Sequence, residues 1–348
     1  MNSLNPTPAA IMAQAGSMRG FAAEFNNLDH YIRVITDRIW EGRQIDTIRD
    51  YYSDPCGVIT PSGASTDVQS VIDGTKATLA QFPDRRLLAE DVIEAGDAQA
   101  GFLSSHRIIS TMTHLGDGNF GKASGKKIHV RTVADCVCKD NRIVHEWLVR
   151  DQGAIAAAVG STPQEMAQRW LGLRSQPLLP LPQPAAPIWW RNPMSDEPMA
   201  QRYAKSIGTM LTGQANDETL YDEAACSLGP VNSTHYGRLD IQAFYASVAR
   251  SMRAGSYEIE SIAFMPASSS MGRAPRVALR WRLKGKHSGA GRYVTGAADA
   301  RNSLDILGIS HAEFVKIGKE WQVHREWVLI DDVAVWMQVF DSKVAHKN

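Results

Sequence analysis

The sequence predicts an α+β protein of two tandem cone-shaped domains, each a curled antiparallel sheet covered by its N-terminal helices. The first observation is a repeat: residues 143–151 and 323–331 both carry Glu-Trp followed by Asp at one spacing, 180 residues apart. The second is the order of patterns, because in each half helical spacing precedes long alternating strands. The third is a proline-rich stretch, residues 175–194, between the two halves.

The length of 348 residues fits this division, because one hydrophobic core seldom extends over more than about 250 to 300 residues. Residues 1–20 are small and polar and predict a flexible tail. We therefore expect one domain at residues 21–174, a linker at 175–194 and a second domain at 195–348.

The first half reads as helices followed by strands. Apolar residues recur every three or four positions at first, and after Pro83 they alternate between Gly-rich turns. The predicted helices are 28–40, 45–52, 67–82, 154–159 and 164–171. The predicted strands are 56–60, 87–95, 100–115, 126–139 and 142–150. Consecutive strands with short turns indicate an antiparallel sheet.

The second half repeats this order after the linker. Its predicted elements are a helix 199–211, a short helix around Tyr221, a helix 239–252, and strands from residue 257 onward, including 306–317. Residues 284–303 are rich in Gly and Ala and lengthen one hairpin.

Charge and composition narrow the class of partner. The chain has 37 basic and 37 acidic residues without a basic run, which argues against nucleic acid and favours a small hydrophobic molecule. No secretory signal or membrane-spanning run is present, so we expect no membrane contact and a cytoplasmic location with four reduced cysteines.

No motif predicts a cofactor or a metal. Residues 116–121 match a dinucleotide fingerprint formally but precede a strand, which predicts a hairpin turn. Cys136 and Cys138 lack the second ligand pair of a zinc site, and His145-Glu146 lacks the second His of a zinc-protease helix.

The closing strands carry a resemblance to a known family. Asn141-Arg142-Ile143 with Trp147 and Asp151, and Val323 with Trp327 and Asp331, resemble the closing strand of the SnoaL-like polyketide cyclases. That family lies within the superfamily of ketosteroid isomerase, scytalone dehydratase and nuclear transport factor two. The resemblance implies a helix-covered cone in each half. It also implies an intramolecular pseudo-dimer, with further homo-oligomerisation left open.

The chain departs from that family at the catalytic positions. The cyclase acid/base Asp aligns with Leu148 in the first half and Val328 in the second, and its partner His with Ala134 and Phe314. None of these side chains moves a proton, so the resemblance does not carry over aldol cyclisation.

Asp151 and Asp331 are the first candidates for catalysis. Each follows a strand and precedes a helix, which fits a helix N-cap. The alternative is a general base, because burial in an apolar pocket would raise the pKa of either carboxyl group.

His129 and Arg131 are candidates on the strand 126–139, where alternation puts them on one face with Asp135. That face either meets solvent or the sister domain, or lines a wet pocket with a His-Arg pair for a carboxylate or enolate. In the second half, His311 and Glu313 are aligned with Arg131 and Val133.

The remaining candidates are residues that we expect to line a pocket. His106, His145 and His311 each fit a surface or core histidine as well as a functional one. For Trp147 and Trp327, a role in packing the sheet is favoured over a role as a platform for the substrate.

Three functions remain open from these residues. The first is a cofactor-free acid/base enzyme, a cyclase, isomerase or lyase, acting on a hydrophobic carbonyl compound. The second is a non-catalytic tandem module that binds a small ligand or a protein, favoured by the lost cyclase Asp and His. The third is that one half is structural and supports the other.

Overall fold

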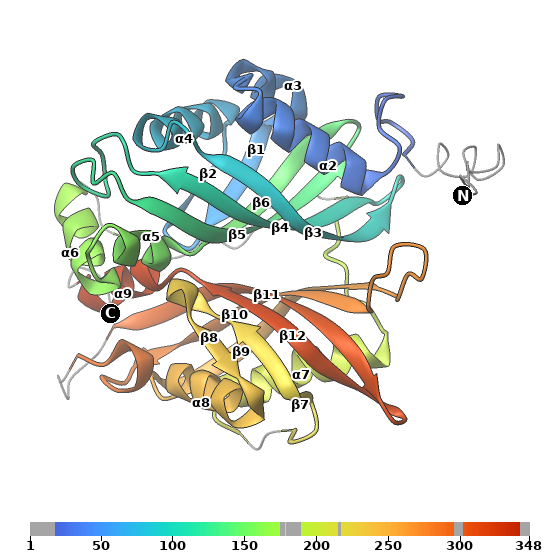
Figure 1. The fold of residues 1–348 in the computed structure, drawn as a ribbon, viewed down its shortest axis with the longest axis vertical. Helices are drawn as coiled ribbons and strands as arrows, with labels where there is room; N and C mark the ends of the chain where they lie inside the picture. The colour runs from blue at the N-terminus through green and yellow to red at the C-terminus, as the bar shows by residue number, and fades with distance from the viewer. Residues whose placement is uncertain (1–17, 175–177, 179–188, 215–216, 296–301, 342–348) are drawn as a thin grey trace.

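The computed structural model describes residues 18–174, 178, 189–214, 217–295 and 302–341. Residues 1–17 of the predicted tail, most of the predicted linker and residues 296–301 of the predicted insertion lie outside these ranges. Within them, two six-stranded sheets each carry helices on one face (Figure 1). This confirms the predicted α+β class and the two curled sheets.

The first unit contains residues 18–174. Its helices are α2 (Leu28–Thr36), α3 (Ile48–Tyr51), α4 (Val68–Gln81), α5 (Gln152–Ala158) and α6 (Pro163–Leu173). Its strands are β1 (Tyr52–Thr60), β2 (Gly63–Ser65), β3 (Arg86–Asp97), β4 (Gly101–Thr113), β5 (Lys127–Lys139) and β6 (Arg142–Arg150). The sheet order is β2-β1-β6-β5-β4-β3, antiparallel except for the parallel pair β1 and β6.

The second unit repeats this layout. Its helices are α7 (Pro198–Leu211), α8 (Gly237–Ala249) and α9 (Asp332–Phe340). Its strands are β7 (Tyr221–Leu228), β8 (Thr234–Tyr236), β9 (Met252–Met265), β10 (Arg276–His287), β11 (Ser303–Ile317) and β12 (Glu320–Ile330), in the order β8-β7-β12-β11-β10-β9. The predicted short helix around Tyr221 is wrong, because this residue begins a strand that pairs in parallel with β12.

Local sequence sets where the helices begin. The side chain of Asn27 accepts a hydrogen bond from the backbone N–H of His30, and Asp67 accepts one from Ser70, so both act as N-caps. Thr162 and Glu165 form a reciprocal capping box at the start of α6.

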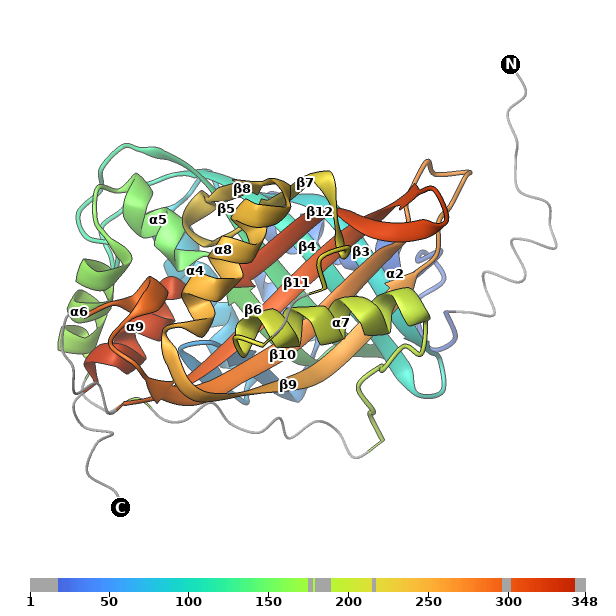
Figure 2. The same cartoon turned by 90° about the horizontal axis from the view of Figure 1, so that it is seen from below.

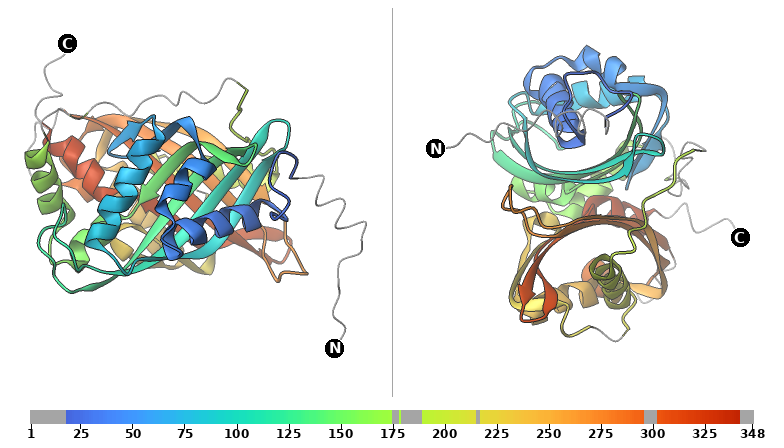
Figure 3. Two further views of the ribbon diagram at one scale, coloured as in Figure 1. Left: turned by 90° about the horizontal axis from the view of Figure 1, so that it is seen from above. Right: turned by 90° about the vertical axis from the view of Figure 1, so that its right-hand side faces the viewer.

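The two sheets pack back to back, with the helices on the outer sides (Figure 3, right). Their shared core includes Trp147, Val149 and Val133 from the first sheet, and Trp327 and Ile309 from the second. At one end of the molecule, α6 also packs against α9 (Figure 2).

The interface has a pseudo-twofold arrangement of arginine and tryptophan. The guanidinium of Arg280 lies 3.5 Å from the ring of Trp147, and that of Arg107 lies 3.5 Å from the ring of Trp327. Arg107 faces Val133 across its strand pair as Arg280 faces Ile309, so the two arginines are equivalent. Each sheet therefore stacks its arginine on the tryptophan of the other.

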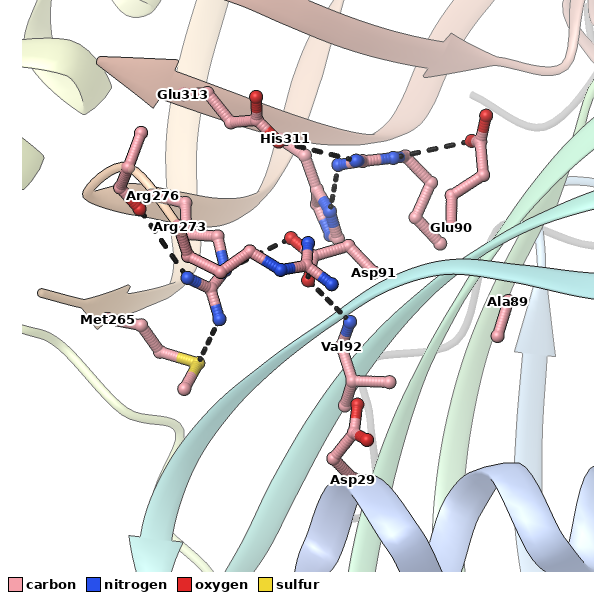
Figure 4. A network of polar contacts seen from close by, with 12 residues as sticks. Asp29, Ala89, Glu90, Asp91, Val92, Met265, Arg273, Arg276, His311 and Glu313 are labelled. Carbon is pink, nitrogen blue, oxygen red and sulfur yellow. Dashed lines mark hydrogen bonds and ion pairs between the residues drawn. The ribbon is translucent and has the colours of Figure 1, made fainter. Parts of the chain in front are cut away.

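A polar network borders this interface (Figure 4). Asp91 on β3 binds Arg276 at 3.1 Å and Arg273 at 3.1 Å from the second unit. Arg107 in turn pairs with Glu90 at 3.4 Å and with Glu313 at 3.7 Å. Asp91 and Arg107 of the first unit thus each pair with charges of the second, so this seam serves the packing of the sheets.

Among the described residues, no helix is both long and apolar enough to cross a membrane. Cys56, Cys136, Cys138 and Cys226 are free, and the first three are buried.

Candidate functional site

The first cone encloses a cavity of about 350 Å³ between its sheet and helices α2 and α4. Its wall is mostly apolar, with Ile32, Ile35, Ile108, Leu148 and Ala134 among the lining residues. Strand alternation explains which side chains face it, because after the bulge at Val144 the even-numbered residues Glu146, Leu148 and Arg150 of β6 line the cavity, whereas Trp147 and Val149 pack toward the second sheet.

Glu146 is the carboxylate that the first sheet places in this cavity. It lies on β6 with only 6% of its surface exposed, and its Oε2 accepts a hydrogen bond from the hydroxyl of Tyr52 at 3.2 Å. Burial raises the pKa of Glu146 to about 7, while the Tyr52 hydroxyl and the charge of Arg150 act in the opposite direction. Burial also raises the pKa of Tyr52 well above its usual value, so its hydroxyl keeps its proton.

Several other polar side chains face the same cavity with unused hydrogen-bonding atoms. Within the described part of the chain, five buried atoms that line it have no hydrogen-bond partner: Arg85 Nη1, His106 Nε2, Thr132 Oγ1, Arg150 Nε and Gln152 Oε1. Buried polar atoms normally find partners, and a cluster of unpaired ones at one cavity is a feature of a ligand site.

His106 is the one predicted histidine that lines the cavity. Burial, reinforced by Arg33 and Arg107, lowers its pKa to about 3. Its imidazole is therefore neutral, and can offer Nε2 as a donor or an acceptor according to the tautomer.

Asp331 reaches the cavity from the second unit. It caps α9 through the N–H groups of Val333 at 3.1 Å and Ala334 at 3.2 Å, and it also lines the cavity of the first cone. Burial, with the charges of Asp151 and Asp332, raises its pKa to about 8 against the pull of these N–H donors.

Asp151 is not among the residues that line this cavity. Its carboxylate caps α5 through Ala154 N–H at 3.0 Å and also accepts from Val231 N–H at 2.9 Å and Asn232 N–H at 3.0 Å. Val231 and Asn232 have positive φ angles of 62° and 53°, and the carboxylate holds this strained turn of the second unit. Burial raises the pKa of Asp151 to about 6. Its geometry is that of a helix cap which joins the two units.

His129 and Arg131 lie on the other face of β5, away from the cavity. His129 is exposed, and Arg131 forms a bidentate ion pair with Glu90 at 2.9 and 3.0 Å. This polar face therefore meets solvent and the sister domain, and it does not line the cavity. The structure does not bring His129, Arg131 and Asp151 together around one pocket.

The other predicted lining residues also lie outside the cavity. Trp147 and Trp327 are buried between the sheets, and His145 packs beside Trp147 with ring centres 4.2 Å apart. Burial lowers the pKa of His145 to about 4. His311 lies in the same interface, where Ser105 Oγ is 2.8 Å from its Nε2 and Arg107 Nη1 is 3.1 Å from its Nδ1.

Strand register corrects the alignment of the two halves. His311 pairs with Trp327 as Asp135 pairs with Trp147, so His311 is equivalent to Asp135 and not to Arg131. By the same register, Ser310 and not Phe314 occupies the place of Ala134. Both hairpins carry the same bulge, but the one between β11 and β12 continues for two further residue pairs, Lys316 with Trp321 and Ile317 with Glu320, so counting back along the sequence from Trp327 fails here.

The second cone is filled where the first is hollow. Trp281 occupies the place of Ile108 and packs over Gly308, where a Cβ atom would lie 2.2 Å from the indole ring. Its Nε1 donates to Ser310 Oγ at 3.0 Å. Glu326, the equivalent of Glu146, accepts from four hydroxyls: Tyr203 at 2.7 Å, Tyr221 at 2.9 Å, Tyr245 at 3.0 Å and Ser227 at 2.8 Å.

Glu146 was missed as a site residue from the sequence, although a signal was present. It lies two positions before Leu148, so both share one strand face, and it recurs as Glu326 in the repeat. The available indication of a site was that a charged residue lies on the strand face expected to turn inward. The described residues contain no group of three or more His, Cys, Asp or Glu side chains placed to hold a metal ion.

Comparison with known proteins gives one family match. The model of the family described as SnoaL-like polyketide cyclase matches residues 30–159. No curated protein matches the chain.

The solved structures that match cover less than half of this chain. IdmH of Streptomyces antibioticus, a putative polyketide cyclase by its description, is 20% identical to this chain. The match covers 38% of this chain and 97% of the IdmH chain, with a TM-score of 0.34. A SnoaL-like polyketide cyclase of Agrobacterium tumefaciens is 18% identical, with coverages of 38% and 98% and a TM-score of 0.32. A nuclear transport factor 2-like protein of Salmonella enterica is 14% identical, with coverages of 38% and 86% and a TM-score of 0.29.

Proposed function

We propose that the first cone, whose residues 30–159 match the model of the SnoaL-like polyketide cyclase family, is the active site of a cofactor-free acid/base enzyme. Its substrate is a hydrophobic carbonyl compound. The observation that carries the proposal is Glu146, a buried carboxylate with one hydroxyl partner in an apolar cavity. With a pKa raised by burial to about 7, it can both accept and return a proton near neutral pH.

The proposed reaction is proton transfer next to a carbonyl group. Ionised Glu146 removes a proton from the carbon beside the carbonyl, and the electrons of that C–H bond move to the oxygen as an enolate. His106, neutral and with Nε2 unpaired, is placed in the same cavity to donate a hydrogen bond to this oxygen. Protonated Glu146 then returns the proton to the same or a neighbouring carbon, which regenerates the carboxylate.

Tyr52 is a positioning residue in this scheme. Its hydroxyl holds the carboxyl group of Glu146 in one orientation, and it belongs to β1, the strand beside β6. The equivalent contact in the second cone is between Tyr221 and Glu326. The repeated pair gives the chain an internal control for the role of its carboxylate.

The experiment is hydrogen–deuterium exchange of α-protons in heavy water, followed by proton NMR, with the full chain and the bicyclic ketone 2-tetralone or its isomer 1-tetralone. We expect exchange faster than in buffer, reduced at least about 100-fold by Glu146→Gln. Glu326→Gln is the matched control and should retain exchange. Equal rates for wild type and Glu146→Gln, or no acceleration of either ketone, would contradict the proposal.

The alternative is a non-catalytic ligand-binding module. It is favoured by Leu148 and Ala134, which line the cavity at the places of the cyclase Asp and His. Ketone binding seen by calorimetry without any exchange would support this alternative.

We further propose that the second cone is a structural partner and that the chain forms an intramolecular pseudo-dimer. The filled interior around Trp281 and the crossed arginine–tryptophan stacks support this role. Light scattering coupled to size exclusion should then give the mass of one chain, and a stable larger assembly would show that the sheet packing does not replace dimerisation.

A further inference from the structure

Two arginines without a carboxylate partner face the cavity of the first cone. Arg85 is 1% exposed; its Nε and Nη2 contact only Ser110 Oγ, at 3.3 and 3.0 Å, and its guanidinium lies 4.8 Å from the ring of Trp40. Arg150 lines the same wall, and within the described ranges no carboxylate lies within ion-pair distance of either guanidinium. A buried cation without a counterion is costly to the fold.

The acidic groups of the cavity do not cancel this charge at neutral pH. Burial raises the pKa of Glu146 to about 7 and that of Asp331 to about 8, so both carboxyl groups are protonated to a large extent. Arginine keeps its proton under these conditions. The cavity therefore carries a net positive charge. Burial, and after it the charge of Arg150, lowers the pKa of Arg85, whereas burial lowers the pKa of Arg150 against the opposing charges of Asp331 and Glu146.

The strand register places the two arginines at one end of the cavity. Arg150 pairs with Thr132, Thr132 with Ile108, and Ser110, which binds Arg85, lies two residues beyond Ile108 on β4. Glu146 lies four residues before Arg150 on β6, which corresponds to roughly 13 Å along the strand. Apolar Leu148 and Ala134 lie between these two ends.

We propose that Arg85 and Arg150 form a carboxylate-binding subsite, and that the ligand of this cavity is an elongated hydrophobic carboxylate whose other end lies at Glu146. Arg85 Nη1 and Arg150 Nε are the buried donors that a carboxylate would satisfy, and Thr132 Oγ1 adds a third at the same end. Charge-assisted hydrogen bonds from arginine suit the planar carboxylate group. This inference deepens the proposed function by naming its substrate class.

The test is calorimetric binding of 2-naphthoate to the full chain, compared with the neutral 2-acetylnaphthalene of similar shape. We expect 2-naphthoate to bind about tenfold more tightly or better, as one charge-assisted contact would give. Equal or tighter binding of the neutral ketone would overturn the inference.

Two variants and one control locate the subsite. Arg150→Gln and Arg85→Gln should each weaken 2-naphthoate binding about tenfold and change 2-acetylnaphthalene binding by less than about threefold. The control is Arg86→Gln, because Arg86 is adjacent in sequence but its side chain is 65% exposed and pairs with Glu41. Unchanged affinity in both cavity variants would contradict the assignment.

Thermal unfolding separates a binding role from a structural role. Arg85→Met removes a buried charge that has no counterion, so we expect an unchanged or higher melting temperature together with weaker 2-naphthoate binding. If Arg85 instead holds the fold together, the variant will melt at a lower temperature and bind both ligands equally poorly.

The pH dependence tests the inference on the unaltered chain. The titratable and charged groups around the subsite are Glu146, Asp331 and His106 in the cavity, with Glu41 and Arg43 near Arg85. Between about pH 6 and pH 9, Glu146 and Asp331 ionise while His106 stays neutral, so 2-naphthoate should bind several-fold more weakly as pH rises. A constant affinity over this range would count against the subsite.

Failure of this inference is distinguishable from failure of the proposed function. Exchange that depends on Glu146, without preference for the carboxylate, would retain the enzyme and reject the subsite. Tight 2-naphthoate binding that depends on the two arginines, without exchange of any ketone, would retain the subsite and reject the enzyme.

Discussion

The two cones place the same carboxylate in opposite surroundings. Glu146 and Glu326 occupy equivalent positions on β6 and β12, yet Glu146 accepts one hydroxyl in a cavity and Glu326 accepts four in a filled core. A carboxylate surrounded by donors is a structural group, whereas one with free lone pairs in an apolar cavity can exchange a proton. The comparison shows that the partners of a residue decide its role.

One large side chain contributes to the difference in space. Trp281 fills the second cone at the place that Ile108 holds in the first, and Gly308 in place of Thr132 makes room for its ring. The two cones therefore differ by substitutions that are coupled across a pair of strands.

The largest expected effect comes from copying this pair into the first cone. The double variant Ile108→Trp, Thr132→Gly should fill the cavity and reduce 2-naphthoate affinity by at least about 100-fold, since the site is occupied by the indole. Calorimetry measures the affinity, and circular dichroism checks that the chain remains folded. Retained affinity would show that the ligand binds elsewhere.

Emptying the second cone should affect stability instead of binding. Trp281→Ala leaves a cavity in a packed core and should lower the free energy of unfolding by about 3 to 5 kcal/mol. Ile108→Ala enlarges a cavity that already exists and is expected to cost about 2 kcal/mol, the low end for such a substitution. Urea unfolding of both variants gives the comparison, and equal losses would mean that the two cores are equally packed.

The next effect is the pH dependence of stability caused by Glu146. Because its folded pKa of about 7 lies above its unfolded value, the folded state binds the proton more tightly, and stability falls as pH rises toward 7. Glu146→Gln should remove this loss, which amounts to roughly 3 kcal/mol at most. Urea unfolding at several pH values tests it, and an unaltered pH profile in the variant would contradict the assigned pKa.

The smallest effect concerns the two tyrosines. Tyr52→Phe removes the one hydroxyl that favours ionised Glu146, so the pH midpoint of exchange activity should move upward by about one unit. Tyr221→Phe leaves Glu326 with three hydroxyl donors and should cost about 1 kcal/mol of stability without moving that midpoint. A downward shift in the first variant would argue against the role of Tyr52.

The sequence predicted the elements of both units well where the pattern was long and periodic. The four late strands of the first half, the start of a helix at Asp67 and the repeat of Glu-Trp all follow from local chemistry that acts within a few residues. The prediction from sequence failed at Tyr221. A short run of residues there fits a helix or a strand, and it is the pairing with β12 that makes it a strand.

The site itself required the tertiary structure. Alternation divides β5 and β6 into two faces, but it does not state which face the helices cover, so Trp147, His145 and Arg131 were candidates while Glu146 was not. Only the packing of the sheets assigned the first set to the interface and Glu146 to the cavity. The sequence by itself determined two similar units with equivalent carboxylates. The tertiary structure decided that one unit is hollow and the other filled, because cavity volume depends on side chains from distant strands and helices together.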